Sequence, residues 1–551
     1  MRWQNPDGAA PRGRRPESPT VRRRLGLGAV LGLSVLGLSG AIGGVGVVNP
    51  SVSGSSASRS PSAAATAYRK ATRVAIPLKV STTVTKRRAS TSSSSTTIPK
   101  VSTVAVGAAS PAGRMASPNP TGRRLTARNS EELQRVVESA RPGDVIDVAD
   151  GRYRTGITIP KGVRGTPGNP IVLRSRTKAG AVFSDCGGQT LNGGTPCMYV
   201  QGSWIVIQDF LFTGTADGVI ELEGEHNRVF RNGFENTGSG DNGGCCALIT
   251  SPHDWRNKQW NDPNPTRLLR SNRIDENVFR SVRNTVYGQG HGVIGTTFSH
   301  NVIDGPPGIE GDWETEAIKI GGDFANEPTD TVIQFNTIKG WRGSPYTIGI
   351  KGSAVTISYN VIDSGDIYLR IADNNTVVGN VLGDGSIIAA GTNHRLLDNY
   401  VRSVTAPASF GPLTAMTNQS VSNSFGNFDG VNLPFYVARF RDSLAEGNTF
   451  VTTGPSQAVV TVVVASSPGP TGVRFVSNSF VRTSAGPILS GRVDLVTPNV
   501  FSLNLFFCAP PCTSDGLPSG SGNSLSSTVS PGHLLLPTTV RLRSEFVRAS
   551  M

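Results

Sequence analysis

The chain has 551 residues and a formal charge of +14, but that charge is carried by one end of the sequence. Residues 1–125 hold 19 Lys or Arg and 2 Asp or Glu, which leaves 34 basic and 37 acidic residues for the remainder. The high isoelectric point therefore describes a tail and not the folded part. This excludes charge as a reason to assign a nucleic-acid partner, and we expect none.

The N-terminus has the pattern of an export segment. Residues 1–24 form a basic region that ends in three consecutive arginines, and residues 25–48 contain no charged residue. A positive region followed by an apolar core is typical of a signal sequence. Its glycines favour a cleaved or twin-arginine-type signal, while its length would also span a bilayer, so an uncleaved membrane anchor is the alternative. In both cases we expect the chain to be secreted or held at the cell surface.

Residues 49–125 are rich in Ser, Thr and Ala and hold few large apolar residues, which is typical of a flexible linker. The folded part is expected to begin with a helix, because Asn129 and Glu132 have the spacing of a capping box. We expect this helix to cover the N-terminal end of a solenoid. Residues 145–148 would form its first strand, with a turn at residues 151–153.

An Asn-x-apolar motif recurs through most of the remaining sequence. Its spacings are 24, 35, 24, 20 and 19 residues up to Asn399, and each copy follows a short β-branched run. The copies are Asn277, Asn301, Asn336, Asn360, Asn380, Asn399, Asn448 and Asn478. This period predicts a repeat architecture, and its strand-like composition predicts a single-stranded right-handed parallel β-helix of the pectate-lyase-like kind. Asn suits a stacked corner because it tolerates the left-handed conformation. We place the β-helix at residues 126–507 and a C-terminal tail at residues 508–551.

Six cysteines in an exported chain suggest disulfides. Cys186 with Cys197 and Cys508 with Cys512 are plausible local pairs. The state of the adjacent Cys245 and Cys246 stays open, because a bridge between neighbouring residues is strained. The cysteines and histidines have no zinc spacing.

The same period can be applied to the charged residues. His291 lies ten residues before Asn301, Lys351 nine before Asn360 and Arg370 ten before Asn380. Lys319 joins them if the extra residues of its longer coil loop out. Stacked like charges repel one another unless an anion lies between them, so such a column predicts an anionic ligand. The alternative is that these are scattered solvated cations, with a structural role for His291.

Three segments in this region resemble polysaccharide lyase family six, the family of chondroitinase B-like enzymes and alginate lyases. Residues 316–321 (Glu-Ala-Ile-Lys-Ile-Gly) resemble the family's Glu-Thr-Ile-Arg-Ile-Gly stretch. Residues 348–353 are similar to the segment around its catalytic lysine, and residues 367–370 to the segment that ends in its catalytic arginine. The opening at residues 130–153 also resembles the family's cap and first coil.

The resemblance implies an enzyme that cleaves a uronic-acid-containing polymer, of the alginate or glycosaminoglycan type, by β-elimination. It implies that Lys351 is the general base and that Arg370 stabilises the enolate-like intermediate or helps to protonate the leaving oxygen. Lys319, His291 and Glu316 would contact the anionic polysaccharide. We expect a monomer.

The chain departs from the family at its calcium site. The three family ligand positions correspond to Trp313, Ser344 and Tyr346, so we predict no metal and no cofactor unless Glu314 and Glu316 compensate. Ile371 stands at a family histidine, and residues 389–390 are alanines where a substrate-binding cation is common. Two alternatives remain: a non-catalytic glycan-binding or adhesin-like β-helix, and a β-helix glycoside hydrolase, which would need two carboxylates in the cleft.

Overall fold

The computed structural model describes the chain from residue 121 to residue 526, with gaps. The described residues are 121–186, 196–215, 218–238, 246–252, 268–283, 285–305, 316–321, 327–341, 346–370, 372–404, 412–419, 437–454, 458–464, 471–490, 499–509 and 522–526. The predicted basic region at 1–24, the signal or anchor at 25–48 and the linker up to residue 120 lie outside them. Among the described residues, no helix has the length and hydropathy needed to cross a bilayer.

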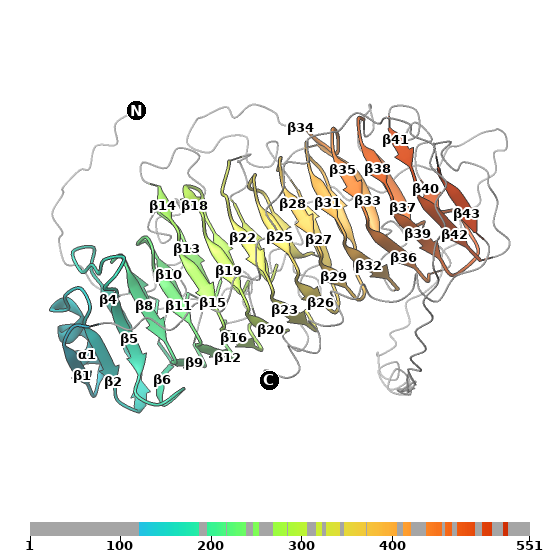
Figure 1. The fold of residues 1–551 in the computed structure, drawn as a ribbon. Helices are drawn as coiled ribbons and strands as arrows, with labels where there is room; N and C mark the ends of the chain where they lie inside the picture. Colours follow the sequence, from blue (N-terminus) through green and yellow to red (C-terminus); the bar gives the residue numbers. More distant parts are fainter. Residues whose placement is uncertain are drawn as a thin grey trace, which may run out of the picture. The chain divides into compact units, whose positions relative to one another are not determined.

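Three long sheets hold most of the described strands, and the chain passes through them in turn (Figure 1). Sheet A consists of β1 Arg124–Ala127, β2 Val145–Val148, β5 Ile171–Ser175, β8 Ile205–Gln208, β11 Arg228–Phe230, β15 Arg273–Asp275, β19 Thr297–Ser299, β22 Val332–Gln334, β25 Thr356–Ser358, β28 Thr376–Val378, β31 Arg395–Leu397, β35 Leu444–Glu446, β38 Arg474–Val476 and β41 Val500–Ser502. Sheet B consists of β3 Gly151–Tyr153, β6 Ala181–Ser184, β9 Leu211–Thr213, β12 Gly233–Glu235, β16 Val278–Arg280, β20 Val302–Asp304, β23 Thr337–Lys339, β26 Val361–Ile362, β29 Val381–Leu382, β32 Tyr400–Ser403, β36 Thr449–Thr452, β39 Ser479–Arg482, β42 Leu505–Cys508 and β43 Ser524–Ser526.

Sheet C completes each coil. Its strands are β4 Ile157–Ile159, β7 Met198–Val200, β10 Ile220–Leu222, β13 Leu248–Thr250, β17 Tyr287–Gln289, β21 Ile318–Ile320, β24 Tyr346–Ile350, β27 Asp366–Leu369, β30 Ile387–Ala389, β33 Leu413–Gln419, β37 Val460–Val464 and β40 Leu489–Ser490, with β34 Val437–Arg439 antiparallel to β33. A short parallel pair, β14 Leu269–Arg270 and β18 Val293–Ile294, stands apart. The predicted parallel β-helix is thereby confirmed.

Apolar side chains fill the interior of the solenoid in register. In sheet C, Ile318 pairs with Ile348, Ile348 with Ile367 and Ile367 with Ile387, and all four are fully buried. Side chains alternate along a strand, so the residue that follows each of these isoleucines in its strand faces outward. The register therefore fixes which residues of successive coils share the outer surface.

The predicted asparagine stack is present at the corner between sheets A and B. Asn336 donates its backbone N–H and its Nδ2 to Asn360 Oδ1 at 3.0 and 2.9 Å, and its Nδ2 also bonds to Phe298 O at 3.0 Å. The same pattern links each predicted copy to the next, and the stack also includes Asn232, Asn504 and Asn523. We call this series the asparagine ladder.

Helix α1, Ser130–Glu138, closes the N-terminal end as predicted. Asn129 Oδ1 accepts the N–H of Glu132 at 2.8 Å, and the Glu132 carboxylate accepts the N–H of Arg128 at 2.8 Å. Leu133 and Val137 on its inner face are fully buried against the first coil. A capping side chain of this kind stabilises a short helix by about 1 kcal/mol.

Two boundary predictions were wrong. Residues 151–153 form strand β3, which pairs with β6, instead of a turn. A strand of three residues suffices here because Tyr153 is buried in the core. At the other end, β43 pairs in parallel with β42, so the solenoid extends past the predicted limit at residue 507.

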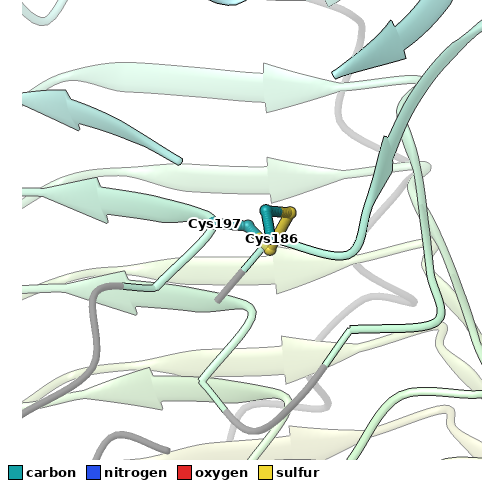
Figure 2. Close-up of a disulfide and its surroundings, with 2 residues drawn as sticks. All are labelled: Cys186 and Cys197. Carbon is teal, nitrogen blue, oxygen red and sulfur yellow. A yellow bond between two sulfur atoms is a disulfide. The ribbon is translucent and has the colours of Figure 1, made fainter. Parts of the chain in front are cut away.

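The predicted disulfide between Cys186 and Cys197 is present (Figure 2). It joins the end of β6 to the start of β7, and both cysteines are buried. Cys246 takes part in a disulfide as well, and so does Cys508. The remaining cysteines, Cys245 and Cys512, lie outside the described residues, so the predicted 508–512 pair is not tested.

Candidate active site

The candidate site lies on the outward face of sheet C, where β21, β24 and β27 are neighbours. Ile350 pairs with Leu369, and both side chains point into the core. Lys351 and Arg370 follow these two residues directly and so occupy the same position on successive coils. The backbone hydrogen bonding of sheet C continues through both residues, because Lys351 N–H bonds to Ile320 O and Arg370 N–H to Ile350 O, each at 2.8 Å. Adjacent strands lie about 4.8 Å apart, which puts the two residues beside each other.

The two cations differ in exposure. The Lys351 side chain is buried, with 3% of the residue exposed, whereas Arg370 is partly exposed. A buried amine beside a fixed guanidinium can act on an acidic C–H without competition from water, while the guanidinium stays charged toward an incoming anion. The pair thus sets a buried amine next to a partly exposed guanidinium.

The predicted single column of four cations was wrong. Lys319 pairs with Gly349, which in turn pairs with Tyr368, so Lys319 lies two residues before the position of Lys351. The even offset keeps it on the same outward face. The predicted alignment failed because the turn from sheet C to the next ladder asparagine varies in length from coil to coil.

His291 is also out of that column. Gln289 pairs with Ile320, which places His291 one residue beyond the Lys351 position. The residue is buried, and its Nδ1 lies 3.1 Å from Glu327 Oε2. Glu327 also accepts the N–H of Gly292. Its position supports the structural alternative for His291 better than a direct contact with substrate.

Glu316 lies close to the centre of the site. The residue is 4% exposed, and a Cβ placed on Gly349 would be 3.1 Å from its Cγ and Oε1. The absence of a side chain at Gly349 thus makes room for this carboxylate between the strands of Lys319 and Tyr368. Its Oε2 has no hydrogen-bond partner among the described residues. A buried carboxylate oxygen in that state is costly unless a ligand donates to it.

Two tyrosines complete this surface, and the sequence reasoning gave neither of them a role. The rings of Tyr346 and Tyr368 lie 4.4 Å apart at an angle of 37°. They meet because of a β-bulge: Tyr346 pairs with Asp366 while Ile348 pairs with Ile367, which leaves Thr347 as an extra residue. Bulges often re-aim side chains beside active sites. A one-residue shift of this kind leaves no signal in residue spacing.

Burial shapes the electrostatics of these neighbours. It raises the pKa of the Tyr346 and Tyr368 hydroxyls above their ordinary value, although the positive charge of Arg370 opposes this at both. It also raises the pKa of Asp366 to about 7, against the N–H of Ser386, which donates to Oδ1 at 2.7 Å. Burial therefore favours the neutral forms of Tyr346, Tyr368 and Asp366.

The donor set here does not fit calcium. Calcium takes six to eight oxygen ligands, with several carboxylates as a rule. The described residues bring two carboxyl groups, Glu316 and the buried Asp366, among three cations. None of their His, Cys, Asp and Glu side chains gather in a group of three that could hold a metal ion. Trp313 and Ser344 lie outside the described residues, as does Glu314. Independence from calcium stays a prediction.

Comparison with known proteins decides the family. The sequence model of chondroitinase B matches residues 127–433, which is more than half of the chain. The chain belongs to the chondroitinase B family. It is therefore a polysaccharide lyase of family six, and the matched range contains all five predicted site residues. No curated protein matches the sequence.

Solved structures of family-six enzymes share the fold. A mannuronic-acid-specific family-six lyase from human gut microbiota has a TM-score of 0.58 at 17% identity, covering 78% of this chain and 99% of its own. The family-six alginate lyase AlyGC has a TM-score of 0.57 at 17% identity, covering 74% of this chain and 53% of its own. The alginate lyase AlyF-OU02, solved with G6, has a TM-score of 0.53 at 16% identity, covering 76% and 91%.

Proposed function

We propose that this family-six lyase cleaves a uronate-containing polymer, of the alginate or glycosaminoglycan type, with Lys351 as general base and Arg370 as the group that stabilises the transition state. The observation that carries the proposal is the register of β24 and β27, which sets the two residues side by side on adjacent coils. The family supplies the reaction class, and the solved relatives named for mannuronate and alginate support a uronate as the substrate.

The chemistry is a β-elimination on one sugar. The Lys351 amine takes the proton from C5, and the electron pair of that C–H bond forms the C4–C5 double bond. The C4–O4 bond breaks and its electron pair leaves with O4, which takes a proton from water next to the Arg370 guanidinium. The C5 proton is weakly acidic, so the enolate-like charge on the carboxylate must be stabilised as it develops. Arg370 and Lys319 are the described cations placed to do this.

The other outward residues suit substrate binding. The partly exposed Tyr346 presents an aromatic ring next to Arg370. Glu316 Oε2 is available to accept a hydrogen bond from a sugar hydroxyl. A ring flanked by a few placed polar groups is the usual composition of a ligand site. The contact with an anionic polymer would therefore involve Lys319, Glu316 and Tyr346 around the reacting pair.

The test is incubation of the protein with a panel of polymannuronate, polyguluronate, dermatan sulfate and hyaluronan. The expected result is an increase in ultraviolet absorbance from the unsaturated product with at least one polymer, and none with neutral dextran. If none of the four yields an unsaturated product while one or more still bind, the protein would be a glycan-binding β-helix and the lyase substrate proposed here would be wrong.

We also propose that the chain is exported through residues 1–48, which lie outside the described residues. Three arginines before an uncharged, glycine-rich run support an export signal. Deleting residues 1–48 should retain the protein inside the producing cell. Unchanged release of the deleted form into the medium would contradict this assignment.

A further inference from the structure

A hollow lies near the N-terminal end of the solenoid, at the corner where the chain passes from sheet C to sheet A. Its volume is about 390 Å³, which falls within the range of small-ligand sites. It is separate from the candidate active site and shares no residue with it. The lining residues used below are Lys161, Arg164, Gly165, Trp204, Glu225 and His226.

Two stacked rings form one wall of this hollow. The rings of Trp204 and His226, on successive coils, have centroids 4.2 Å apart and an interplanar angle of 13°. On the preceding coil Gly165 takes the corner position, and a Cβ there would lie 2.6 Å from Trp204 O, so no side chain fits. The indole face opposite His226 is therefore not covered by a corner side chain.

Two cations stand beside this open aromatic face. Lys161 and Arg164 are exposed, and neither forms an ion pair with any residue that the structure describes. Arg164 Nε donates to Lys161 O at 3.2 Å, which holds the guanidinium against the loop and leaves its terminal nitrogens for a ligand. Glu225 also lines the hollow, and its Oε2 lies 3.9 Å from His226 Nε2. The described lining thus holds the cations Lys161 and Arg164 and one carboxylate, which is next to the imidazole.

The hollow and the candidate active site lie along the same edge of the solenoid. Backbone bonds follow this corner from coil to coil: Trp204 N–H to Glu225 O, His226 N–H to Arg270 O, Ser271 N–H to Ile294 O, Gly295 N–H to Thr329 O and Thr329 N–H to Ser353 O. Ser353 is two residues beyond Lys351. Five coil steps of about 4.8 Å separate the two places, or roughly 24 Å along the solenoid axis. An extended oligosaccharide lying along this edge could contact both.

We propose that this hollow is a second binding site for anionic polysaccharide. A sugar ring would pack its C–H face on Trp204, and its carboxylate or sulfate would meet Lys161 and Arg164. An aromatic platform with neighbouring cations matches the apolar face and the charged edge of such a sugar. The choice of ligand class rests on the proposed function, but binding here does not require catalysis.

The test is electrophoresis of the full chain through gels containing polymannuronate, polyguluronate or dermatan sulfate, at about 0.15 M salt so that surface charge is screened. We expect at least one polymer to retard the native chain. Trp204→Gly should raise the apparent dissociation constant roughly tenfold, as loss of a binding-site aromatic commonly does. Glycine is chosen because Trp204 has a φ of +59°, which glycine adopts without strain.

Lys161→Ala with Arg164→Ala should give a similar loss and a weaker salt dependence. The matched control is Tyr359→Gly, which removes a ring stacked on Phe335 at a φ of +55° from the corner between sheets A and B. It should migrate like the native chain. All variants keep the basic N-terminus, so differences between them report on the hollow.

The inference is overturned if none of the three polymers retards the native chain, or if Trp204→Gly and the double variant are both retarded as strongly as the native chain while melting at its temperature. Its failure is distinct from failure of the proposed function. Binding lost on Trp204→Gly without any unsaturated product would support the hollow alone, whereas product formation with unchanged retardation would support the lyase alone.

Discussion

The corner between sheets A and B and the outward face of sheet C are made by the same coils, yet they differ in how strongly each residue is repeated. At the corner one residue type recurs, and each asparagine bonds to the next coil in the same way. On sheet C the outward position changes from Lys319 to Gly349 to Tyr368 between neighbours. The interior and the corner hold the scaffold together, which leaves the outer face free to vary with the chemistry.

The largest expected effect is on catalysis, when the two cations on the outer side of sheet C are replaced. Lys351→Ala should lower kcat by about a thousandfold, within the range of general-base removal, while polymer binding is largely kept. Arg370→Ala should weaken both binding and turnover, and Arg370→Lys should not restore them fully because the planar fork is lost. Steady-state kinetics on the polymer that gives product checks this, with melting temperature as the control. Wild-type rates in both alanine variants would remove these residues from the mechanism.

Substitution in the asparagine ladder should instead lower stability and leave catalysis nearly unchanged. Asn360→Ala removes hydrogen bonds to Asn336, Ile333 and Asn380 and leaves buried polar groups without partners. Unfolding in denaturant should show a loss of roughly 4 kcal/mol, with little change in the rate per folded molecule. Asn393→Gly is the matched control, because this exposed corner asparagine has a φ of +58°. An equal loss of unfolding free energy in both variants would mean that a buried ladder asparagine stabilises the fold no more than an exposed corner asparagine does.

Asp366 extends the comparison to pH, because it is a buried carboxyl group at the start of β27, the strand that leads to Arg370. Its pKa is raised to about 7, so the native state keeps a proton that the unfolded chain releases near pH 4. Stability from this group is present in acid and is lost as the pH rises through about 7. From about pH 5 to pH 8 the wild type should lose roughly 2.5 kcal/mol relative to Asp366→Asn. Parallel stability curves for the two proteins would refute this.

His394 acts with the opposite sign. Its pKa is lowered to about 4 by burial, and the ring Nδ1 accepts the N–H of Asn375 at 3.2 Å. Protonation on acidification would break that bond, so this contribution to stability falls between about pH 6.5 and pH 4. Because both proteins in the Asp366 comparison carry His394, the difference between them isolates the carboxyl group.

The smallest effect is expected from chelation. Because the described donor set does not fit calcium, chelation should leave both the rate and the melting temperature unchanged. Assay after dialysis against chelator, with and without added calcium or magnesium, is the measurement. A large loss that calcium alone restores would mean that Glu314, Glu316 or backbone oxygens build a site.

The residue pattern predicted the scaffold better than the surface, for a physical reason. Each ladder asparagine is required by its neighbours, so the period could be counted along the chain. The same counting found Lys351 and Arg370 because their two coils differ little in length. It misplaced Lys319, whose coil is longer, and His291, whose coil equals that of Lys351 in length but has a longer turn before the ladder asparagine. It also gave no role to the Tyr346 and Tyr368 pair, which depends on a bulge. The spacing of residues along the sequence does not show where a loop or a bulge holds extra residues.

The parallel register has a consequence for how the molecule opens. Apart from β33, which also pairs with β34, the described strands of sheets A, B and C bond to the strands one coil before and one coil after them. Fluctuations should therefore begin at the terminal coils and advance inward one coil at a time. Amide exchange with deuterium should be slowest in the central coils around β21 and β24 and faster toward β43. The coils that position Lys351 and Arg370 would thus be the last to lose their protected amides.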